Sequence, residues 1–496
     1  MKITLNDLIR FGAIILIFAL LFNCKKDNVS TKVPTNVVIK DTSIVNRFIY
    51  TGLQTYYLWE DSIPNLKATK YNNADTLNAY LNSYNDPQKF FTSLLYQSGT
   101  VDKWSFLVND STTISNWIAG ISKSMGYDFW HAQLGTTSNV VIIVKYVFKG
   151  SPAEKAGLKR GDLFLKVNGT QLTLSNWDQY LLNNPTTYTL SMASISNNTV
   201  SLNGKSLTMT AVTLQENPIL MDTVLTVGNY KVGYLVYNGF NSDFDLQLNQ
   251  VFQDFKSAAI DKLIVDLRYN GGGSVQTATY LASMIYGTAT SKVFYTEQYN
   301  PLVQAYYQST DPTSLSNNFV SQIAATSTTA ATPINALNLS SLYVIMTDGT
   351  ASASELLING LTPYMNVFKV GSNTVGKYVA SVTIQDWETN GTVNPKDPYV
   401  MQPIIVRIAN SQGVTNFRNG LTPDYSIQED VANLMPFGDP NETLLKPVLD
   451  QIQGIPLSSV SLKSTQLGLK KLGDSQSYRI FPQSMYIKNF KKIPKK

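Results

Sequence analysis

The chain has 496 residues, of which 43% are hydrophobic and 15% charged, with a formal net charge of +5. A chain of this length buries large cores, and we expect about two to four domains. Its single histidine and single cysteine exclude an intrachain disulfide, an ordinary His/Cys zinc site and a His-Glu-x-x-His metalloprotease. No cofactor is expected.

Residues 1–24 have the layout of a secretory signal. Lys2 and Arg10 precede a continuous apolar run, 11–22, which is shorter than the ~20 residues that a membrane-spanning helix needs. Cys24 follows directly, as in a bacterial lipoprotein signal peptide, and is the expected lipidation site. The alternative is an uncleaved membrane anchor. Both predict an extracytoplasmic protein attached to a membrane of the cell envelope.

The next segment, 25–42, is polar and is expected to be a linker. It begins with Lys25-Lys26-Asp27, which resembles the short charged export tag of surface lipoproteins in the Bacteroidetes, so the protein is expected to face either the periplasm or the cell surface. From 43 to 110, aromatic and aliphatic residues recur at helical spacing, which predicts a small helical N-terminal domain.

Residues 123–213 have the features of a small β-rich domain. The β-branched run 140–147 predicts a strand, Pro152 suits the start of a short helix and Gly157 its end, and Asn168-Gly169 predicts a hairpin turn. This ordered set resembles a PDZ domain. The resemblance implies that the domain binds the C-termini of unfolded or tagged proteins as an added strand.

In such a domain a turn of backbone N–H groups holds the peptide carboxylate. The segment Gly126-Tyr127-Asp128-Phe129 lies where that turn is expected. His131 follows it, either to grip a substrate or, as we favour, as a surface or packed side chain.

From 225 to 450 strands and helices alternate, which predicts an α/β layered domain. Strands are expected at 231–237, 262–267, 342–346 and 367–370, and helices at 244–258 and 352–361. Between them, 290–337 is rich in Ser, Thr, Asn and Ala with few periodic features. We interpret it as a family-variable insertion.

A serine and a lysine suggest where nucleophilic chemistry could occur. Ser352 lies in a small-residue turn that opens an apolar helix, and Lys377 follows it by 25 residues. A serine needs a neighbouring base, and His131 lies far upstream in another segment. A lysine serves if burial lowers its pKa, so Ser352 and Lys377 form a candidate Ser-Lys dyad.

A second motif lies at residues 266–273, where an expected buried strand ends in a run of three glycines. Glycines let backbone N–H groups turn toward a ligand. The run lacks the Gly-Lys-Ser/Thr ending of a phosphate-binding loop. Ser352 at a helix N-terminus would likewise lie among N–H groups that favour an oxyanion.

Together with the PDZ unit, these motifs resemble the C-terminal processing peptidases, also called tail-specific proteases, over roughly residues 110–450. The resemblance implies an α/β multidomain protein with a helical N-terminal domain, a PDZ-like domain and a crotonase-like peptidase core. It implies Ser352 as nucleophile and Lys377 as general base. Oxyanion donors would be the N–H groups of Ala353 and of Gly272 or Gly271, and the reaction peptide hydrolysis through an acyl-enzyme.

The chain departs from the family at one place. Several members have a glutamine four residues after the lysine, and this chain has Ser381, our candidate orienter of Lys377. One alternative is that Ser352 is only a helix cap and Lys377 is an exposed turn lysine. Another is that Ser354 is the nucleophile. Glu355 and Arg268 are interpreted as structural. The alternative function is a peptide-binding scaffold that has lost turnover.

The end of the chain, 451–496, is expected to be a basic tail. Its last 36 residues carry nine Lys or Arg residues against one acid, Asp474. We interpret it as a solvated terminus, and no nucleic acid is expected as a partner. The oligomeric state is left open.

Overall fold

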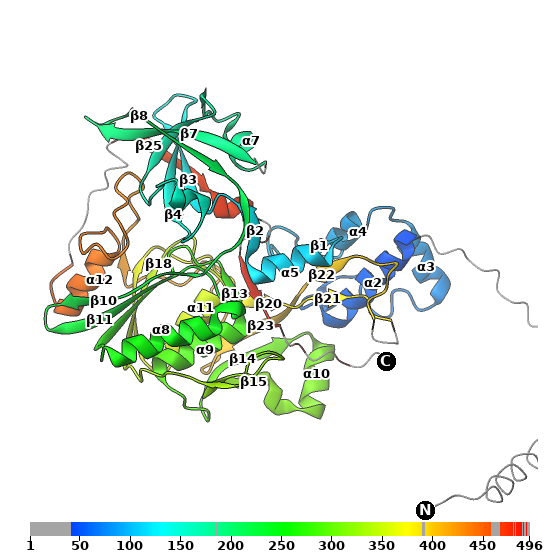
Figure 1. Ribbon diagram of the computed structural model, residues 1–496. Helices are drawn as coiled ribbons and strands as arrows, with labels where there is room; N and C mark the ends of the chain where they lie inside the picture. Colours follow the sequence, from blue (N-terminus) through cyan, green and yellow to red (C-terminus); the bar gives the residue numbers. More distant parts are fainter. Residues whose placement is uncertain are drawn as a thin grey trace, which may run out of the picture. The chain divides into compact units, whose positions relative to one another are not determined.

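The computed structural model describes residues 41–183, 186–388, 392–457, 467–479, 481, 483–488, 490 and 493. The expected signal peptide with Cys24, and residues 25–40 of the expected linker, lie outside these residues. From Asp41 onward the chain forms one unit (Figure 1). Within the described ranges, no helix has the length and apolar character needed to cross a membrane.

A small helical region opens this unit. It contains α2 (Asp41–Tyr56), η1 (Glu60–Ser62), α3 (Ala74–Asn82) and α4 (Pro87–Ser93). Asp86 caps α4 by accepting hydrogen bonds from two backbone N–H groups, and Pro87 suits the first helical position. Ile49 and Leu53 of α2 are fully buried in a core shared with α4. The predicted helical N-terminal domain is confirmed.

The PDZ-like domain is built on a sheet of order β25-β3-β4-β5-β7-β8, with β6 paired to β5. Asn168 and Gly169 adopt φ values of 50° and 78° in the hairpin turn that the sequence predicts. The elements are β2 (Ile121–Ser124), β3 (Tyr127–Leu134), β4 (Val140–Val147), α6 (Pro152–Lys155), β5 (Leu163–Val167), β6 (Thr170–Gln171), α7 (Trp177–Leu181), β7 (Thr187–Ser196), β8 (Thr199–Thr210) and β9 (Val212–Gln215).

The third region is the α/β core. Its main sheet has the order β10-β11-β12-β18-β19-β24, parallel from β11 onward. The strands are β10 (Ile219–Val227), β11 (Tyr230–Tyr237), β12 (Lys262–Asp266), β18 (Ser341–Met346), β19 (Asn366–Gly371) and β24 (Tyr425–Ser426). This α/β arrangement agrees with the expected fold class.

Helices cover both faces of this sheet (Figure 1). Leu263 and Val265 of β12 share a core with α8 (Asp245–Ser257), α9 (Val275–Tyr286) and α11 (Ala353–Leu361), whereas Ile264 between them packs with α12 (Leu445–Gln453). The alternation follows from the period of two in a strand. The layers position the ends of β12 and β18 side by side.

A second sheet of order β13-β26-β20-β23-β14-β15 adjoins the first. It contains β13 (Gly272–Ser274), β14 (Val293–Tyr299), β15 (Ser316–Asn318), β20 (Val379–Ser381), β23 (Ile404–Asn410) and β26 (Ser484–Tyr486). A smaller sheet joins β1 (Phe106–Val108) to β22 (Val400–Gln402) and β21 (Ile384–Gln385). Three further short helices are α5 (Ser111–Ala119), η2 (Ser242–Phe244) and η4 (Ser475–Tyr478).

The stretch 290–337, which shows few periodic features in the sequence and was interpreted as a family-variable insertion, contains regular structure. This stretch contains β14, α10 (Pro301–Thr310), η3 (Pro312–Leu315), β15, β16 (Gln322–Ile323) and β17 (Thr332–Pro333), and β14 pairs with β23 in the second sheet. Phe294 and Tyr295 are buried in it, and Asn300 caps α10 ahead of Pro301. These local signals were hidden by the polar composition around them.

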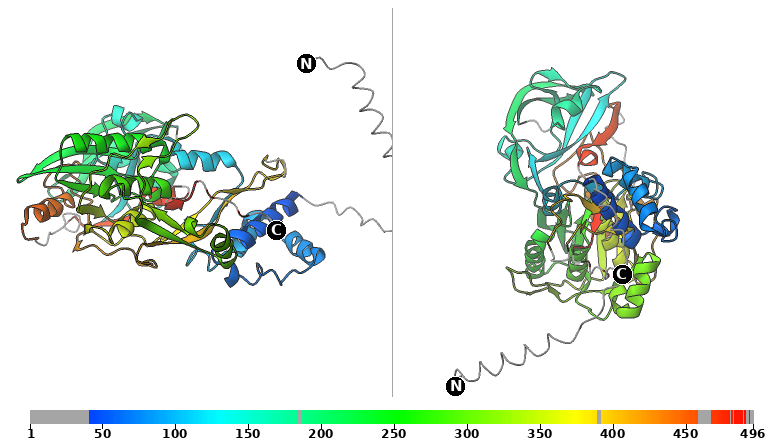
Figure 2. Two further views of the ribbon diagram at one scale, coloured as in Figure 1. Left: turned by 90° about the horizontal axis from the view of Figure 1, so that it is seen from below. Right: turned by 90° about the vertical axis from the view of Figure 1, so that its right-hand side faces the viewer.

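The interpretation of the basic tail as a solvated terminus is wrong for the part of the tail that the structure describes. β25 (Leu469–Asp474) pairs antiparallel with β3, and β26 pairs with β13 and β20. The red C-terminal segment lies against the PDZ-like strands in the right panel of Figure 2. Main-chain hydrogen bonds to a sheet edge need no apolar side chains, so a lysine-rich sequence does not forbid such strands.

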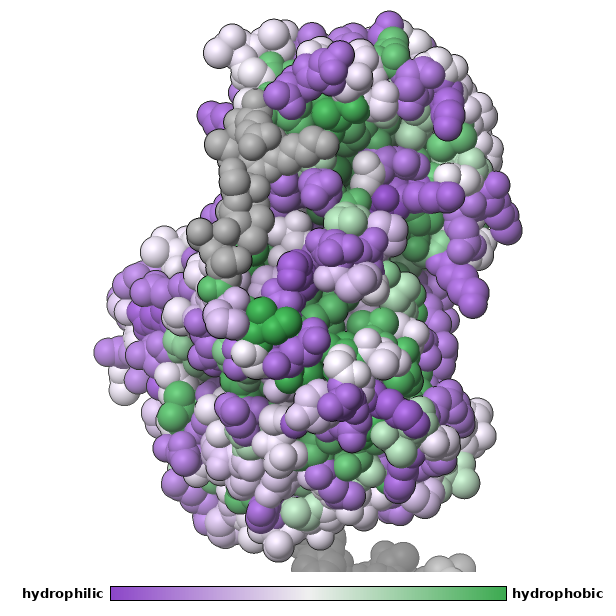
Figure 3. All heavy atoms as spheres, turned by 90° about the vertical axis from the view of Figure 1, so that its left-hand side faces the viewer, coloured by the Kyte–Doolittle hydropathy of each residue, from purple (hydrophilic) through white to green (hydrophobic). Residues whose placement is uncertain are grey.

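The face seen in Figure 3 mixes hydrophilic and hydrophobic side chains. Large exposed hydrophobic residues of the described chain come from many separate elements, among them Leu174, Val224 and Leu246. Scattered single residues of this kind are normal on a protein surface and point to no docking face.

Candidate active site

The loop after β12 and the turn after β18 are joined by hydrogen bonds. The Thr350 hydroxyl donates to the carbonyl of Leu267 at 2.7 Å, and the Ala351 N–H donates to the carbonyl of Asn270 at 3.0 Å. Both segments leave parallel neighbouring strands, so they emerge at the same sheet edge. The contacts bring the predicted serine turn against the glycine run.

Ser352 lies at the N-cap of α11 with a φ of 69°. A positive φ is strained for a residue with a side chain, and such strain is concentrated at functional sites. The side chain is fully buried, and its Oγ has no hydrogen-bond partner among the residues that the structure describes. Ser352 is therefore a buried hydroxyl that no described contact claims.

Gly272 packs directly against this serine. Its φ is 104°, and a Cβ placed on it would lie 2.6 Å from the Cβ of Ser352 and 2.2 Å from the carbonyl oxygen of Ser484. Only glycine fits here. The Gly272 N–H donates to Oδ1 of the buried Asn270 at 2.9 Å, and Nδ2 of Asn270 donates to the carbonyl of Tyr237. Asn270 directly precedes the glycine run but was not singled out from the sequence.

Glu355 joins the two segments that carry the candidate dyad. One carboxylate oxygen accepts the N–H groups of Ser352 at 2.7 Å and Lys377 at 2.8 Å. The other accepts the Gly376 N–H at 2.7 Å and the Thr374 hydroxyl. Burial raises the pKa of Glu355, and these hydrogen bonds oppose that rise by stabilising the charged form. The residue interpreted as structural thus fixes Ser352 and Lys377 relative to each other.

Lys377 is not an exposed turn lysine, because only 2% of it is accessible. Its Nζ donates to the carbonyl of Gln483 at 2.9 Å and lies 5.2 Å from the centre of the Trp104 ring. Burial lowers the pKa of Lys377 to about 7, against the opposing pull of Asp102 and Glu355. The neutral amine, which a general base requires, is therefore populated near neutral pH.

The candidate orienter does not hold this amine. Ser381 is buried, but its Oγ donates to the carbonyl of Met485 at 3.2 Å. No described hydrogen bond joins Nζ of Lys377 to Ser381 or to Ser352. The role predicted for Ser381 is therefore not seen among the described hydrogen bonds. Gln483 and Trp104 contact the amine instead, and neither had been singled out from the sequence.

Ser354 is the less suitable serine. It is fully buried, and its hydroxyl donates to the carbonyl of Asn270 at 3.1 Å. That bond ties α11 to the glycine loop, which is a structural task.

Arg268 lies beneath the site in a buried ionic cluster. It pairs with Asp266 and Glu442, both at 2.7 Å, and with Glu429 at 2.9 Å. Arg160 of the PDZ-like domain reaches the same Glu429 at 2.6 Å. Burial alone would raise the pKa of Glu429, but the two arginines lower it to about 2. These contacts are those expected of a structural role for Arg268. The cluster links the PDZ-like domain to the glycine loop.

The segment predicted to be the carboxylate-binding turn is covered. Gly126 has a φ of 86°, while Tyr127 and Phe129 are buried in the domain core. Asp128 pairs with Arg479 at 2.8 Å, and the Phe129 N–H donates to the hydroxyl of Ser475 at 2.9 Å. Residues that follow β25 therefore take the place predicted for a peptide terminus.

His131 is a packed side chain. It is buried and stacks on Trp177 of α7 with ring centres 3.9 Å apart. Burial lowers its pKa to about 4, so it is neutral at pH 7. A packed imidazole of this kind is not placed to act as a base for Ser352.

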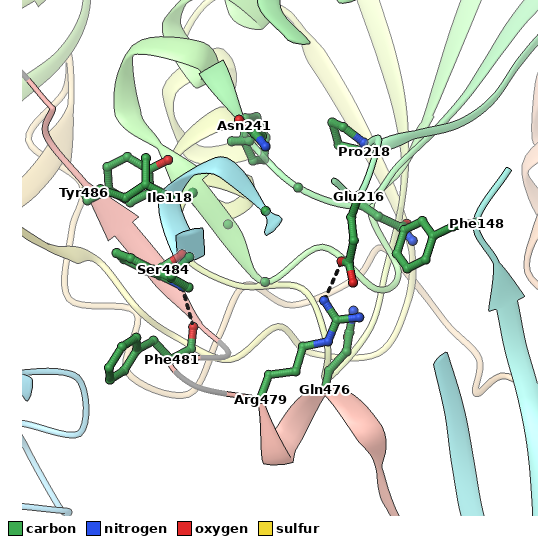
Figure 4. Close-up of a pocket in the computed structure, with 18 of the residues that line it drawn as sticks. Ile118, Phe148, Glu216, Pro218, Asn241, Gln476, Arg479, Phe481, Ser484 and Tyr486 are labelled. Atoms are coloured by element: carbon green, nitrogen blue, oxygen red, sulfur yellow. Dashed lines mark hydrogen bonds and ion pairs between the residues drawn. The ribbon is translucent and has the colours of Figure 1, made fainter. Parts of the chain in front are cut away.

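A pocket of about 160 Å³ borders the glycine loop (Figure 4). Arg479 crosses it to pair with Glu216 at 2.6 Å, and Ser484 and Tyr486 project from β26 beside it. Its wall includes Gly271, Gly272 and Gly273. Polar side chains and glycine backbone thus line this cavity, whereas Ser352 and Lys377 do not.

Three segments of the chain match known family models. Residues 231–427 match peptidase family S41, 45–106 match the peptidase S41 N-terminal domain, and 143–190 match the PDZ domain. Residues 231–427 thus form a peptidase family S41 domain. The S41 match spans both the glycine loop and the Ser352 turn, and the predicted resemblance is confirmed.

Two relatives illustrate the family. The chain is 25% identical over 329 residues to the chloroplastic C-terminal processing peptidase of Tetradesmus obliquus, covering 63% of this chain and 61% of that protein. It is 24% identical over 251 residues to a Staphylococcus aureus protein named as a probable CtpA-like serine protease, covering 49% and 43%. The S41 chain thus matches less than two thirds of the length of either relative.

The fold also has a solved counterpart. A crystal structure from Bacteroides fragilis assigned to the S41 proteases superposes with a TM-score of 0.63 at 24% identity, covering 83% of this chain and 98% of that one. This likeness supports the multidomain fold.

Proposed function

We propose that the protein is a serine endopeptidase that hydrolyses peptide bonds with Ser352 as nucleophile and Lys377 as general base. The observation that carries the proposal is the shared carboxylate of Glu355, which holds the backbones of both residues. The lowered pKa of Lys377 adds a base that is neutral near pH 7. The strained, unpaired Ser352 hydroxyl adds the nucleophile.

In the proposed reaction, the neutral amine of Lys377 takes the proton of Ser352 as its Oγ attacks the substrate carbonyl. The resulting oxyanion accepts hydrogen bonds from the N–H of Ala353 and from Gly272 or Gly271. The protonated Lys377 then gives its proton to the leaving amine, which leaves an ester on Ser352. Water, deprotonated by Lys377, hydrolyses that ester and regenerates the serine.

Two movements precede this reaction. Lys377 must leave the carbonyl of Gln483 and turn toward Ser352. If Gly272 serves as a donor, its N–H must turn from Asn270 toward the oxyanion. Both are local rotations of single groups.

The proposed substrates are the C-termini of unfolded or tagged proteins. The PDZ match over 143–190 and the likeness to a C-terminal processing peptidase support this class. We further propose, from the layout of residues 1–24, an extracytoplasmic protein anchored to the cell envelope by lipid on Cys24.

The test is hydrolysis of an unfolded, C-terminally tagged protein by the purified parent and by Ser352→Ala, Lys377→Ala and Ser354→Ala variants. We expect the first two to lose activity by at least about 10³-fold and the third to keep it if it folds. Activity that survives in Ser352→Ala would refute the assignment. Binding of the tagged protein without hydrolysis by the parent would favour a peptide-binding scaffold.

A further inference from the structure

The last strand of the described residues, β26, lies inside the candidate active site. β26 fits between β13 and β20, parallel to both. The Ser484 N–H donates to the carbonyl of Gly271 at 3.0 Å, and the Ile487 N–H donates to the carbonyl of Ser381 at 3.0 Å. The glycine loop and the strand that follows Lys377 are thus bridged by a piece of extended backbone.

This strand covers both members of the candidate dyad. The carbonyl of Gln483 accepts the Lys377 amine, and the carbonyl oxygen of Ser484 packs on the Gly272 backbone beside Ser352. Ser352 is fully buried, and Met485 is only 1% exposed. An incoming polypeptide therefore cannot reach Ser352 in this conformation.

The segment just before the strand is fastened to the PDZ-like domain. Arg479 pairs with Asp128 at 2.8 Å and with Glu216 at 2.6 Å. Figure 4 shows the pair with Glu216. β25 pairs with β3, and Ser475 accepts the Phe129 N–H. One stretch of chain therefore occupies the edge where a peptide would add to the PDZ-like sheet and then the catalytic cleft.

We propose that residues 483–487 are an intramolecular inhibitor that fills the site for the extended strand of a polypeptide substrate. This inference rests on the proposed peptidase function. The site pairs with main-chain groups of its occupant on both sides, so it suits an extended polypeptide of varied sequence. A substrate must displace the tail before it is cleaved.

The contacts fit an inhibitor better than a cleaved substrate. Lys377 donates to a tail carbonyl, and Ser352 Oγ has no partner in the described chain. The Gly272 N–H is bonded to Asn270. The tail therefore holds the amine of the base through a carbonyl, while a candidate oxyanion donor is bonded to Asn270.

The experiment weakens the strand in the full chain. Ser484→Pro removes the N–H that reaches Gly271, and Ile487→Pro removes the one that reaches Ser381. Lys488→Ala is the matched control, because this side chain is exposed and bonds only to the hydroxyl of Ser242 among the described contacts. Circular dichroism and thermal melting check that each variant folds.

Three readouts are compared. Hydrogen exchange reports the protection of residues 484–487, and a fluorescent peptide of sequence 481–490 reports whether the site is open. Hydrolysis of the tagged protein reports turnover. If the tail occupies the site about 90% of the time, only about one molecule in ten is open. The apparent affinity for the peptide, and the rate of hydrolysis at low substrate concentration, then fall about tenfold. We expect each proline variant to lose protection, to bind the peptide at least about tenfold more tightly than the parent, and to turn over faster by a similar factor.

If the proline variants bind the peptide more tightly but do not hydrolyse the tagged protein, the tail occupies the proposed site and the peptidase function is refuted. The proposal is overturned if the proline variants lose protection in the tail but bind the peptide no better than the parent and Lys488→Ala. It is also overturned if mass spectrometry finds the parent cleaved within 483–487 and Ser352→Ala intact, because the tail would then be a substrate.

Discussion

Ser352 and Lys377 donate their backbone N–H groups to the same carboxylate oxygen of Glu355, at 2.7 and 2.8 Å. The two residues belong to separate loops, which are also joined by a hydrogen bond from the Val375 N–H to the carbonyl of Thr350 at 3.0 Å. Their relative position depends on Glu355, which itself does not touch the reacting atoms.

We therefore predict that Glu355→Gln lowers kcat about 100-fold with little change in KM, because an amide group that points a donor at these N–H groups displaces both loops. Steady-state kinetics on the tagged protein measure the split. Glu388→Gln, at an exposed position, is the control and should match the parent. A Glu355→Gln enzyme with normal kcat would show that the carboxylate is not needed for alignment.

The activity should depend on pH through Lys377. Burial lowers the pKa of this lysine to about 7, and only its neutral form accepts the serine proton. We expect kcat/KM to rise about tenfold per pH unit below pH 7 and to level off above it. Lys377→Arg should be inactive at every pH because a guanidinium stays protonated. A profile that is flat from pH 5 to 9 would contradict the lysine base.

Gly272 should tolerate no side chain. A Cβ there would approach the Cβ of Ser352 to 2.6 Å at a φ of 104°, so Gly272→Ala should reduce kcat at least about 100-fold. Gly169→Ala is the matched control, because Gly169 also has a positive φ, 78°, but nothing lies within 4 Å of its Cβ position. It should lose about 1 kcal/mol of stability and keep its activity. Equal losses of activity would mean that strain, not crowding at Ser352, is responsible.

Arg160 should contribute strongly to stability. It is buried with Glu429 and Arg268, so Arg160→Ala leaves part of a buried cluster unpaired and should lower the free energy of unfolding by about 3–5 kcal/mol. Lys369→Ala removes the more exposed pair with Asp424 and should change it by about 0–1 kcal/mol. Urea unfolding measures both. Similar small changes in the two variants would contradict a stabilising role for the cluster.

The sequence predicted the parts of the site that depend on local structure. A strand, a turn of small residues and a helix place Ser352 at an N-terminus, and a glycine run after a strand marks the loop that packs on it. Strand 140–147 and the turn at Asn168 were predictable for the same reason, since their signals lie within a few residues.

The rest of the site depends on contacts between distant residues. Lys377 and Gln483 are 106 residues apart, and the predicted orienter Ser381 bonds to a residue 104 positions away. Main-chain pairing of this kind leaves no periodic pattern in side chains, so a basic, polar tail gave no sign of two strands. Asn270 was missed because its amide acts on neighbouring backbone groups that a sequence does not locate.

The pairing of β25 with β3 has a consequence during synthesis. The Phe129 N–H and the Ser475 hydroxyl that meet at its end are 346 residues apart. A nascent chain must therefore expose the edge of β3 until β25 has been made, and an open strand edge is a template for pairing with other chains. The protein should be most prone to aggregation, and most dependent on chaperones, in the interval between the synthesis of β3 and that of β25.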